Sequence, residues 1–299
     1  MKRNLGADTY GIIRGMLRNP PAENIDYLVV GHLTRDLVPG GEQLGGSAAF
    51  AARTAKAFGL QVGMLTSWAG ELEHEALEGI AITNIQSEQA TTFENRYDAG
   101  KRSQTVHALA EALDYQQLPV AWRSPKIVHL APVLGEISPR ILRNFPESTI
   151  GVTPQGWLRT WESDGSVGVN DWPEASFVLP KADAAVISME DVGGDAQIID
   201  SLAASAPVLV VTEAEKGARI FSQGEVIDLG AKAVEEVDAT GAGDIFAAAF
   251  FIRLHFGDDL YEAGRVANSV AAQSVERVGM SSTPTPDEIF DLMPKALPE

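Results

Sequence analysis

Short apolar runs alternate along the chain with stretches of helical composition, and this alternation limits the possible folds more than any other feature. Runs rich in Val, Ile, Leu and Ala, bounded by Gly or polar residues, are typical of strands buried on both faces of a parallel sheet. They lie at residues 25–31, 62–66, 127–131, 149–153, 184–188 and 208–212. Because parallel strands are joined by right-handed helical crossovers, the pattern predicts an α/β fold with helices on both faces of a mainly parallel central sheet.

The expected helices follow from composition and from signals at their ends. Residues 47–58 are rich in Ala, contain no Gly or Pro, and stop at Gly59, as a helix with a glycine C-cap does. A hairpin is expected where two short strands, 219–221 and 226–229, flank Gly224. Further helices are expected near 138–145 and 195–204, and at 244–255, 260–277 and 286–293.

Residues 82–106 have a different pattern. Short half-exposed strands at 82–85 and 91–97 precede a turn at 98–100. This pattern predicts a small β lid outside the main sheet. The apolar side chains of the lid could bury themselves in a monomer or form the contact face of a homodimer, and both states stay open. These side chains are Ile82, Ile85, Phe93 and Tyr97.

The chain lacks repeats and Gly/Ser-rich linkers, so one domain is the simplest partition. Residues 1–24 read as an N-terminal extension that ends near Pro20 and Pro21. We therefore expect a single domain over residues 25–299, carrying the small lid.

The charge balance restricts the partners. The 299 residues include 23 Lys and Arg against 41 Asp and Glu, which gives a formal charge of −18. A charge of this size opposes long-range association with a nucleic-acid backbone, so no nucleic-acid partner is expected. It leaves open a small polyanion such as ATP, which local dipoles and a metal ion can hold.

Several site classes are excluded by residue usage. The chain has no Cys, so disulfides, Cys-based metal sites and thiol nucleophiles are excluded, and its five His are scattered without metal-ligand spacing. No run approaches the ~18 apolar residues of a membrane span, and Lys2 and Arg3 precede no apolar core of a signal peptide. We therefore expect a cytoplasmic protein without a membrane partner.

The stretch from Asp238 to Asp244, Asp-Ala-Thr-Gly-Ala-Gly-Asp, predicts chemistry. Gly241, Ala242 and Gly243 let the backbone approach a ligand closely, and their N–H groups lie at a helix N-terminus. Such a terminus carries partial positive charge and suits a phosphate or its transition state. Asp244, at the same end, is suited to accept the proton of an attacking hydroxyl. The string predicts phosphoryl transfer, and the alternative is an acidic helix start without a catalytic role.

This string resembles the D-T-x-G-A-G-D signature of the ribokinase-like (PfkB) carbohydrate kinases. Four further stretches match that family's landmarks in order and spacing between Asp26 and Pro286. The resemblance implies a ribokinase-like three-layer α/β sandwich with a small β lid. It also implies a kinase that uses ATP and Mg²⁺ to phosphorylate a hydroxyl of a sugar, polyol or cyclitol, with Asp244 as base.

The resemblance assigns an acceptor side. Asp36, after the first strand, matches the acid that holds substrate hydroxyls, and Gly45 and Gly46 match the substrate loop. Phe50 stands where the family usually has an Asn, which puts an ordinary ribose or fructose site in doubt. Plant-type inositol kinases of the family look similar at this position, so a myo-inositol-like acceptor is favoured.

The resemblance also assigns a donor side. Thr212, Ala214 and Gly217 match a V-T-x-G-x-x-G turn, with Ala214 in place of the usual glycine. Asn268 and Ala271 match the helix that lines the adenine pocket.

Two pairs of residues match ion positions. Glu190 and Asp191 align with the element that organises Mg²⁺ through water, and an acidic, exposed helix start is an equal alternative there. Asp238 and Thr240 match positions linked to a monovalent cation such as K⁺.

Two other functions stay open. A nucleoside kinase shares the fold and every phosphate-handling motif, and Phe50 could stack on a base as easily as exclude a sugar hydroxyl. A non-catalytic regulator that binds sugar or nucleotide belongs to a different class. Such a regulator is expected to lack Asp244 or an intact anion hole, and neither loss is seen.

Overall fold

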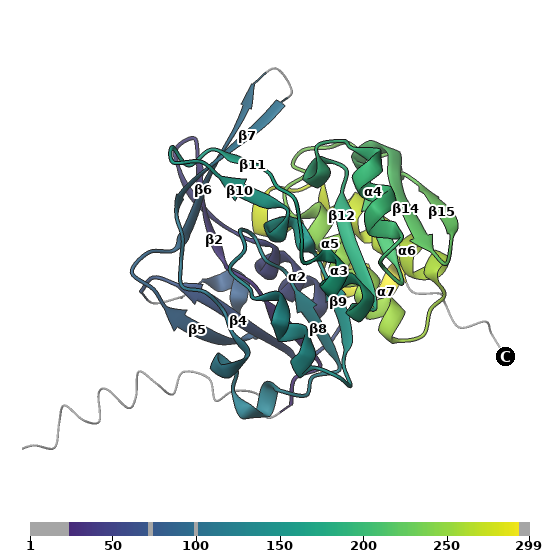
Figure 1. Ribbon diagram of the computed structural model, residues 1–299, viewed down its shortest axis with the longest axis horizontal. Helices are drawn as coiled ribbons and strands as arrows, with labels where there is room; N and C mark the ends of the chain where they lie inside the picture. Colours follow the sequence, from purple (N-terminus) through teal and green to yellow (C-terminus); the bar gives the residue numbers. More distant parts are fainter. Residues whose placement is uncertain (1–23, 71–73, 99–100, 293–299) are drawn as a thin grey trace, which may run out of the picture.

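In the computed structural model, which describes residues 24–70, 74–98 and 101–292, a nine-stranded sheet forms the centre of the protein (Figure 1). The sheet is parallel except for two antiparallel strands at one edge, β14 and β15. Its strands, in spatial order, are β15 (Glu225–Gly230), β14 (Gly217–Ser222), β13 (Leu209–Thr212), β12 (Ala184–Ser188), β9 (Thr149–Val152), β8 (Ile127–Leu130), β1 (Tyr27–Val30), β4 (Val62–Trp68) and β5 (Ala81–Gln86).

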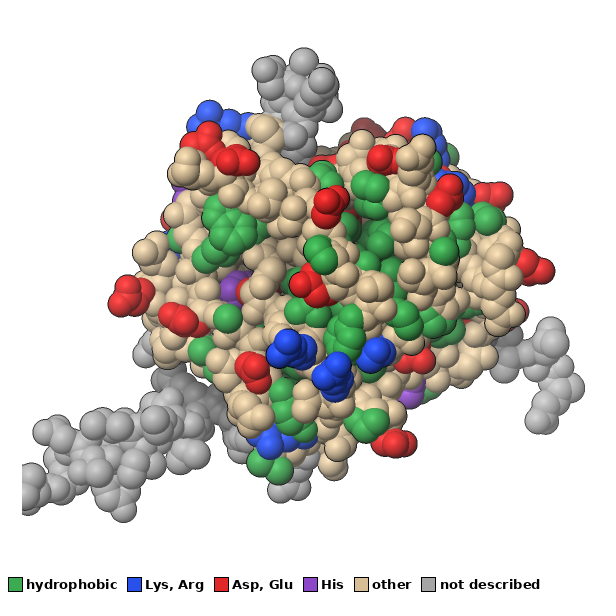
Figure 2. All heavy atoms as spheres, viewed as in Figure 1, with side chains coloured by type: hydrophobic (Ala, Val, Ile, Leu, Met, Phe, Trp, Pro, Cys, Tyr) green, Lys and Arg blue, Asp and Glu red, His purple; other side chains and the backbone are tan. Residues whose placement is uncertain are grey.

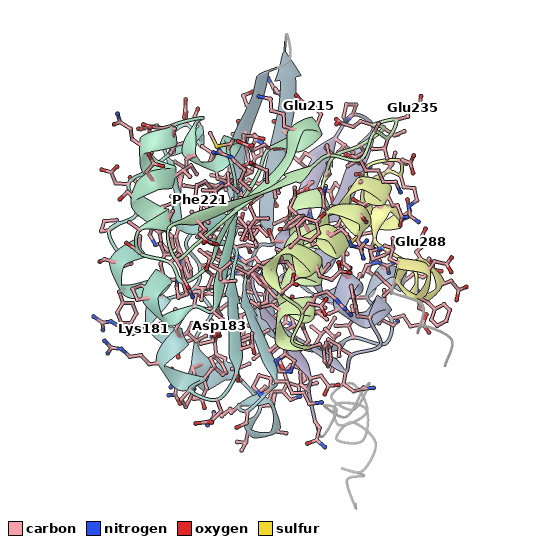
Figure 3. All side chains as sticks on the ribbon, turned by 90° about the vertical axis from the view of Figure 1, so that its right-hand side faces the viewer. Lys181, Asp183, Glu215, Phe221, Glu235 and Glu288 are labelled. Atoms are coloured by element: carbon pink, nitrogen blue, oxygen red, sulfur yellow. The ribbon has the colours of Figure 1, made fainter. Side chains whose placement is uncertain are left out.

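Helices cover both faces of the sheet, as Figure 3 shows with the sheet seen between two helical layers. One layer comprises α2 (Ser47–Ala57), α5 (Ala242–His255), α6 (Leu260–Ser274) and α7 (Pro286–Leu292). The other comprises α3 (Ala175–Val178), α4 (Ala196–Ala203) and several short 3₁₀ helices. The predicted three-layer α/β fold is confirmed.

Alternate residues of the buried strands supply the two apolar cores between these layers. In β1, Tyr27 and Val29 join the core under α2 and α5, whereas Leu28 and Val30 join the opposite core. Helix α5 is apolar on all sides because it lies in the middle of its layer. Its residues Ile245–Ile252 are all buried. The central strands therefore carry mostly apolar side chains on both faces, which is why the sequence shows them as apolar runs.

The short 3₁₀ helices lie mostly at turns that follow strands. They span Glu75–Leu77, Tyr115–Gln117, Val120–Trp122, Pro139–Asn144, Pro154–Trp157, Leu179–Lys181, Glu190–Val192, Ala214–Lys216 and Gly279–Ser282. The helix predicted near 138–145 is thus a 3₁₀ segment that starts at a proline. The other predicted helices and the hairpin around Gly224 are confirmed.

A separate four-stranded sheet projects from the main body. Its strand order is β3 (Gly41–Gly45), β2 (Thr34–Val38), β6 (Thr91–Asp98) and β7 (Lys101–Ala108). A small two-stranded sheet, β10 (Arg159–Trp161) and β11 (Val167–Val169), lies near β7 through a bridge between Thr105 and Ser166. We call the four-stranded sheet the lid sheet.

The lid sheet differs from the predicted lid at 82–106. Strand β5 pairs in parallel with β4 and is the edge of the main sheet, so its residues 82–85 are not part of the lid. An edge strand is half-exposed in the same way as a lid strand, and the sequence pattern does not separate the two. Strands β2 and β3 take the place of β5, since β2 pairs in parallel with β6.

The proposed dimer face is also changed by this placement. Ile82 packs against one core of the main sheet and Ile85 against the other, and Phe93 is buried in a small cluster with Val106, Val133 and Leu134. These three side chains do not share an exposed face. The side chain of Tyr97 and the predicted extension at 1–23 lie outside the described residues. Within the described ranges, no helix has the length and apolar character needed to cross a membrane.

Candidate active site

The N-terminus of α5 lies at the carboxyl ends of the parallel strands. His255, at the other end of α5, hydrogen-bonds through Nδ1 to Thr149 Oγ1 at the start of β9 (2.8 Å). The helix therefore runs opposite to the strands, and its first turn, with Asp244, meets the edge where the strands end. Ligands of open α/β sheets bind at this edge.

Gly241 lies in the turn of the predicted anion hole, and the Phe50 ring packs directly beneath this turn. Gly241 precedes the first residue of α5 with φ of 80°, in the left-handed region that favours glycine. A Cβ at this position would lie 2.3 Å from Cδ1 of Phe50. Phe50 is only 2% exposed, so its ring packs beneath the turn in the core. The structure thus brings these two predicted residues together, with Phe50 as a support for the turn.

Some backbone N–H groups of this turn already donate hydrogen bonds within the chain. The Ala242 N–H donates to the Ala239 carbonyl (3.2 Å), and the Ile245 N–H donates to the Gly241 carbonyl (2.9 Å). Gly243 has open space where a Cβ would stand, so a ligand could approach it closely. The turn is therefore closed by its own hydrogen bond before any ligand binds.

Asp244 is half-buried in the first turn of α5, and a buried polar chain lies beneath it. Burial raises the pKa of Tyr27 well above its ordinary value, and the charge of Asp244 raises it further, so the two groups interact. The Tyr27 hydroxyl bonds to His129 Nδ1 (2.7 Å), and His129 Nε2 bonds to Thr153 Oγ1 (3.0 Å). Burial lowers the pKa of His129 to about 3, so this histidine is neutral.

The acceptor-side residues Asp36, Gly45 and Gly46 also come together. A Cβ on Gly45 would lie 2.2 Å from Asp36 Oδ2, and one on Gly46, where φ is 96°, would lie 2.5 Å from the His32 carbonyl oxygen. The Thr34 hydroxyl donates to Asp36 Oδ1 (2.8 Å). Only glycines allow the loop to pass this close to the Asp36 carboxylate and to the end of β1.

Glu136 is a site-adjacent residue that our sequence reasoning missed. Its carboxylate is 7% exposed and accepts the backbone N–H groups of His32 (3.1 Å), Val133 (2.9 Å) and Leu134 (2.9 Å). The carboxylate thereby ties the loop after β1 to the loop after β8. A polar residue in the loop that follows a buried strand was the available signal.

The donor-side residues lie where β13 ends. Thr212 closes β13, and Ala214 has φ of 50°, so alanine occupies a left-handed position that suits the glycine of the resembling family. A Cβ on Gly217 would lie 2.0 Å from the Leu229 carbonyl oxygen. On α6, the Asn268 amide donates to the Gly230 carbonyl (2.8 Å), and Ala271 is half-buried three residues further on.

Asp191 stabilises the turn next to the donor strand. Its Oδ2 accepts the Ser188 N–H (2.9 Å), and its Oδ1 accepts the Gln155 amide (3.0 Å). The Met189 N–H donates to the Thr212 carbonyl (3.1 Å), so this turn and the end of β13 are adjacent. Glu190, beside Asp191, is exposed.

No group of three or more His, Cys, Asp and Glu is arranged as a metal cage in the part of the chain that the structure describes. Mg²⁺ in phosphoryl-transfer sites is usually held by substrate phosphates, water and only one or two carboxylates. Glu190 and Asp191 would supply the carboxylates of such a site, and Asp191 already accepts hydrogen bonds from Ser188 and Gln155.

Asp238 joins the anion turn to the segment after α6. Its Oδ1 accepts the Thr240 N–H (2.9 Å), and its Oδ2 accepts the Gly279 N–H (3.0 Å). Burial raises the pKa of Asp238, but these hydrogen bonds outweigh burial and hold the pKa below its ordinary value. The carboxylate is thus charged at neutral pH.

Two acidic side chains can be placed at this end of the molecule. Figure 3 labels Glu215 and Glu235 at the end from which the lid hairpin projects. On the face drawn in Figure 2, Asp and Glu side chains are scattered, whereas several Lys and Arg side chains gather in its lower middle.

Comparison with known proteins supports the resemblance drawn from the motifs. Residues 173–288 match the family model described as pfkB family carbohydrate kinase. Ribokinase from Bacillus subtilis is 33% identical over 120 residues, which cover 40% of each chain. Cytidine kinase from Thermococcus kodakarensis is 24% identical over 85% of this chain and 98% of its own. Inositol 3-kinase from Arabidopsis thaliana is 24% identical over 89% of this chain and 76% of its own.

The length of these matches differs. The segment shared with the Bacillus ribokinase is less than half of that protein, and the one shared with a sugar kinase of Pyrococcus horikoshii covers 26% of it.

Solved structures share the fold. A pyrophosphate-dependent kinase of the ribokinase family, complexed with a pyrophosphate analog and myo-inositol, superposes with a TM-score of 0.72 at 20% identity, over 89% of this chain and all of that one. A ribokinase of Arabidopsis thaliana complexed with ribose and ATP has a TM-score of 0.68 at 19% identity, over 90% of this chain and 98% of that one. The predicted ribokinase-like fold and the family resemblance are confirmed.

Proposed function

We propose that this ribokinase-like member of the pfkB family transfers the γ-phosphoryl group of ATP to a hydroxyl of a sugar, polyol or cyclitol, with a myo-inositol-like acceptor as the first candidate. One observation carries the proposal. A glycine turn at a helix N-terminus, with Asp244 in the first helical turn, faces the same sheet edge as the Asp36 carboxylate and its two glycines.

The chemistry assigns one step to each group. Asp36 and the Gly45–Gly46 loop hold the acceptor. Asp244 takes the proton of the attacking hydroxyl as its oxygen bonds to the γ-phosphorus, the bond to the bridging oxygen breaks, and ADP leaves. The N–H groups of Gly241 and Gly243 stabilise negative charge on the transferring phosphoryl group. The Ala242 N–H can donate to this group and to the Ala239 carbonyl at once, as in the bifurcated hydrogen bonds common at helix termini.

A divalent and a monovalent cation would bind near the phosphates of the nucleotide. Mg²⁺, when bound, neutralises charge on the phosphates, and Glu190 or Asp191 would reach it through water. A monovalent cation such as K⁺ would lie beside Asp238 and Thr240. With a formal charge of −18, nucleotide should bind as its Mg²⁺ complex and bind poorly without it.

ATP is favoured as the donor by two exposed apolar side chains. Val237 is 59% exposed and Val278 is 52% exposed, and they flank the Asp238–Gly279 hydrogen bond. An apolar surface next to a phosphate-binding turn suits a nucleobase and gives no benefit to a donor without one, such as pyrophosphate.

A sugar or cyclitol is favoured over a nucleoside by the burial of two rings near the acceptor side. Phe50 is 2% exposed and Phe93 is 3% exposed, so neither presents a face on which a base could stack. A polyol needs hydrogen-bonding groups instead, and Asp36 supplies them.

A coupled ADP-release screen tests the proposal. Purified protein is assayed with ATP or pyrophosphate against sugars, inositols and nucleosides, with and without Mg²⁺ and K⁺. The proposal expects Mg²⁺-dependent turnover with at least one sugar or cyclitol. Turnover with nucleosides alone would support the second candidate, nucleoside kinase, and ATP binding without turnover across the panel would support a regulator.

A further inference from the structure

One rung of the lid sheet places a second polar side chain beside Asp36. The register of β2 and β3 sets Asp36 opposite Gln43, and the register of β2 and β6 sets Asp36 beside Phe93. Side chains directly opposite each other project from the same face of a sheet, with Cβ atoms about 5 Å apart. Gln43 and the Asp36 carboxylate therefore share one face.

This face of the lid sheet contacts the loop that follows β8. Phe93 packs against Val133 and Leu134, which follow the carboxyl end of β8. The Asp36 carboxylate lies against Gly45 at the start of the substrate loop. Buried Phe93 occupies one end of the rung, and the other end carries Asp36 and Gln43.

Gln43 extends from the lid sheet toward the anion turn. Its Oε1 lies 3.6 Å from the position that a Cβ of Gly279 would take, and the Gly279 N–H is bonded to Asp238. The side chain is exposed. Gln43 thus lies between the acceptor carboxylate and the segment that holds the phosphate-binding turn.

We propose that Gln43 binds the acceptor together with Asp36 and selects molecules that carry two neighbouring hydroxyl groups. This inference rests on the proposed function, which it deepens by naming the acceptor class. A carboxylate accepts hydrogen bonds only, whereas a primary amide both donates and accepts. Side by side, the two groups match a vicinal diol on a sugar or cyclitol ring, and a single hydroxyl leaves one of them unsatisfied.

Glu42 provides a matched control on the opposite face. Its carboxylate pairs with Arg35 (3.3 Å), and the Arg35 guanidinium lies over the Trp68 ring at 5.6 Å. Glu42 is exposed and adjacent to Gln43 in the same strand, so its replacement also shortens an exposed side chain of β3 and removes no group from the face that carries Asp36.

The test compares Gln43→Ala, Gln43→Leu and Glu42→Ala with the wild type. Steady-state kinetics are measured with myo-inositol and a monodeoxy-inositol, and with D-ribose and 2-deoxy-D-ribose. For the diol that the wild type phosphorylates, both Gln43 variants should raise the acceptor KM by about three- to tenfold, the value of one net hydrogen bond. The donor KM should stay unchanged, the preference for the diol over its deoxy analogue should shrink by the same factor, and Glu42→Ala should match the wild type.

Three results would overturn the inference. The acceptor KM could stay unchanged in both Gln43 variants, the deoxy analogue could suffer the same loss as the diol, or acceptor and donor KM could rise together as a general disturbance of the lid would cause. A wild type that phosphorylates none of the sugars and cyclitols would instead overturn the proposed function itself, and this inference with it.

Discussion

Substitution of Gly241 by alanine tests the anion turn most sharply. The residue has φ of 80°, and a left-handed alanine costs roughly 1–2 kcal/mol. The added Cβ would also lie 2.3 Å from the buried Phe50 ring, and overpacking of a core costs roughly 1–3 kcal/mol. Gly241→Ala should therefore lower the free energy of unfolding by about 2–5 kcal/mol and reduce kcat, because the turn must shift away from the ring.

Gly243 offers a matched control two residues later. It has an ordinary backbone conformation, and nothing lies within 4 Å of the position of its Cβ. Gly243→Ala should leave stability unchanged or raise it by roughly 0.5–1 kcal/mol.

Urea unfolding of both variants measures the difference. Phe50→Ala alone removes a buried ring and should cost roughly 3–5 kcal/mol. Added to that variant, Gly241→Ala should cost only roughly 1–2 kcal/mol more for the backbone, because the overpacking is gone. If Gly241→Ala were as stable as the wild type, or if Gly243→Ala were equally costly, the packing of Phe50 beneath the turn would be refuted.

Three further predictions address the acceptor, the donor turn and the buried polar chain. Asp36→Ala should raise the acceptor KM at least tenfold and leave the ATP KM unchanged, and equal KM values for the acceptor would remove Asp36 from the site. Ala214→Gly should raise the free energy of unfolding by about 0.5–1 kcal/mol in urea melts, since relief of the left-handed strain exceeds the entropy gained by the unfolded chain, and a loss would contradict that strain. His129 is neutral in the folded protein because burial lowers its pKa from 6.5 to about 3. Between these two pH values the unfolded chain binds one more proton than the folded protein does. The contribution of neutral His129 to stability is therefore present above pH 6.5 and is lost as the pH falls toward 3. The His129 contribution to wild-type stability should fall by about 1.6 kcal/mol between pH 6.5 and 5, so His129→Gln should show a flatter profile; equal slopes would contradict the burial of a neutral histidine.

The fold was largely predictable because its determinants are local. Strand β1 is a continuous apolar run and β8 is interrupted only by His129, while helix α5 is a run of small and aromatic residues that no exposed helix would carry. The place of each strand within a sheet was harder to predict from the sequence. Strand β5 has the half-exposed pattern of a lid strand, and only its pairing with β4 shows that it is an edge of the main sheet.

The geometry of the candidate site was predictable where one short segment contains all the residues involved, as in the turn from Gly241 to Asp244 at the start of α5. It was not predictable where residues far apart meet. The contact between Phe50 and Gly241 joins positions 191 apart, and the hydrogen bonds of Glu136 reach His32 in another loop. The role of Gln43 depends on strand register, which the hydrophobic pattern of a short exposed strand specifies weakly.

Turnover of Asp244→Asn tests the central claim most directly. The amide keeps the size of the carboxylate and cannot accept the proton of the attacking hydroxyl. With the best acceptor from the screen, phosphorylated product and ADP are quantified for the wild type and the variant, and binding of the Mg²⁺–ATP complex is measured by calorimetry. We predict a loss of kcat of at least about 100-fold, the scale of general-base catalysis, with ATP affinity retained. Near-wild-type kcat in the variant would contradict the assignment of Asp244 as the base.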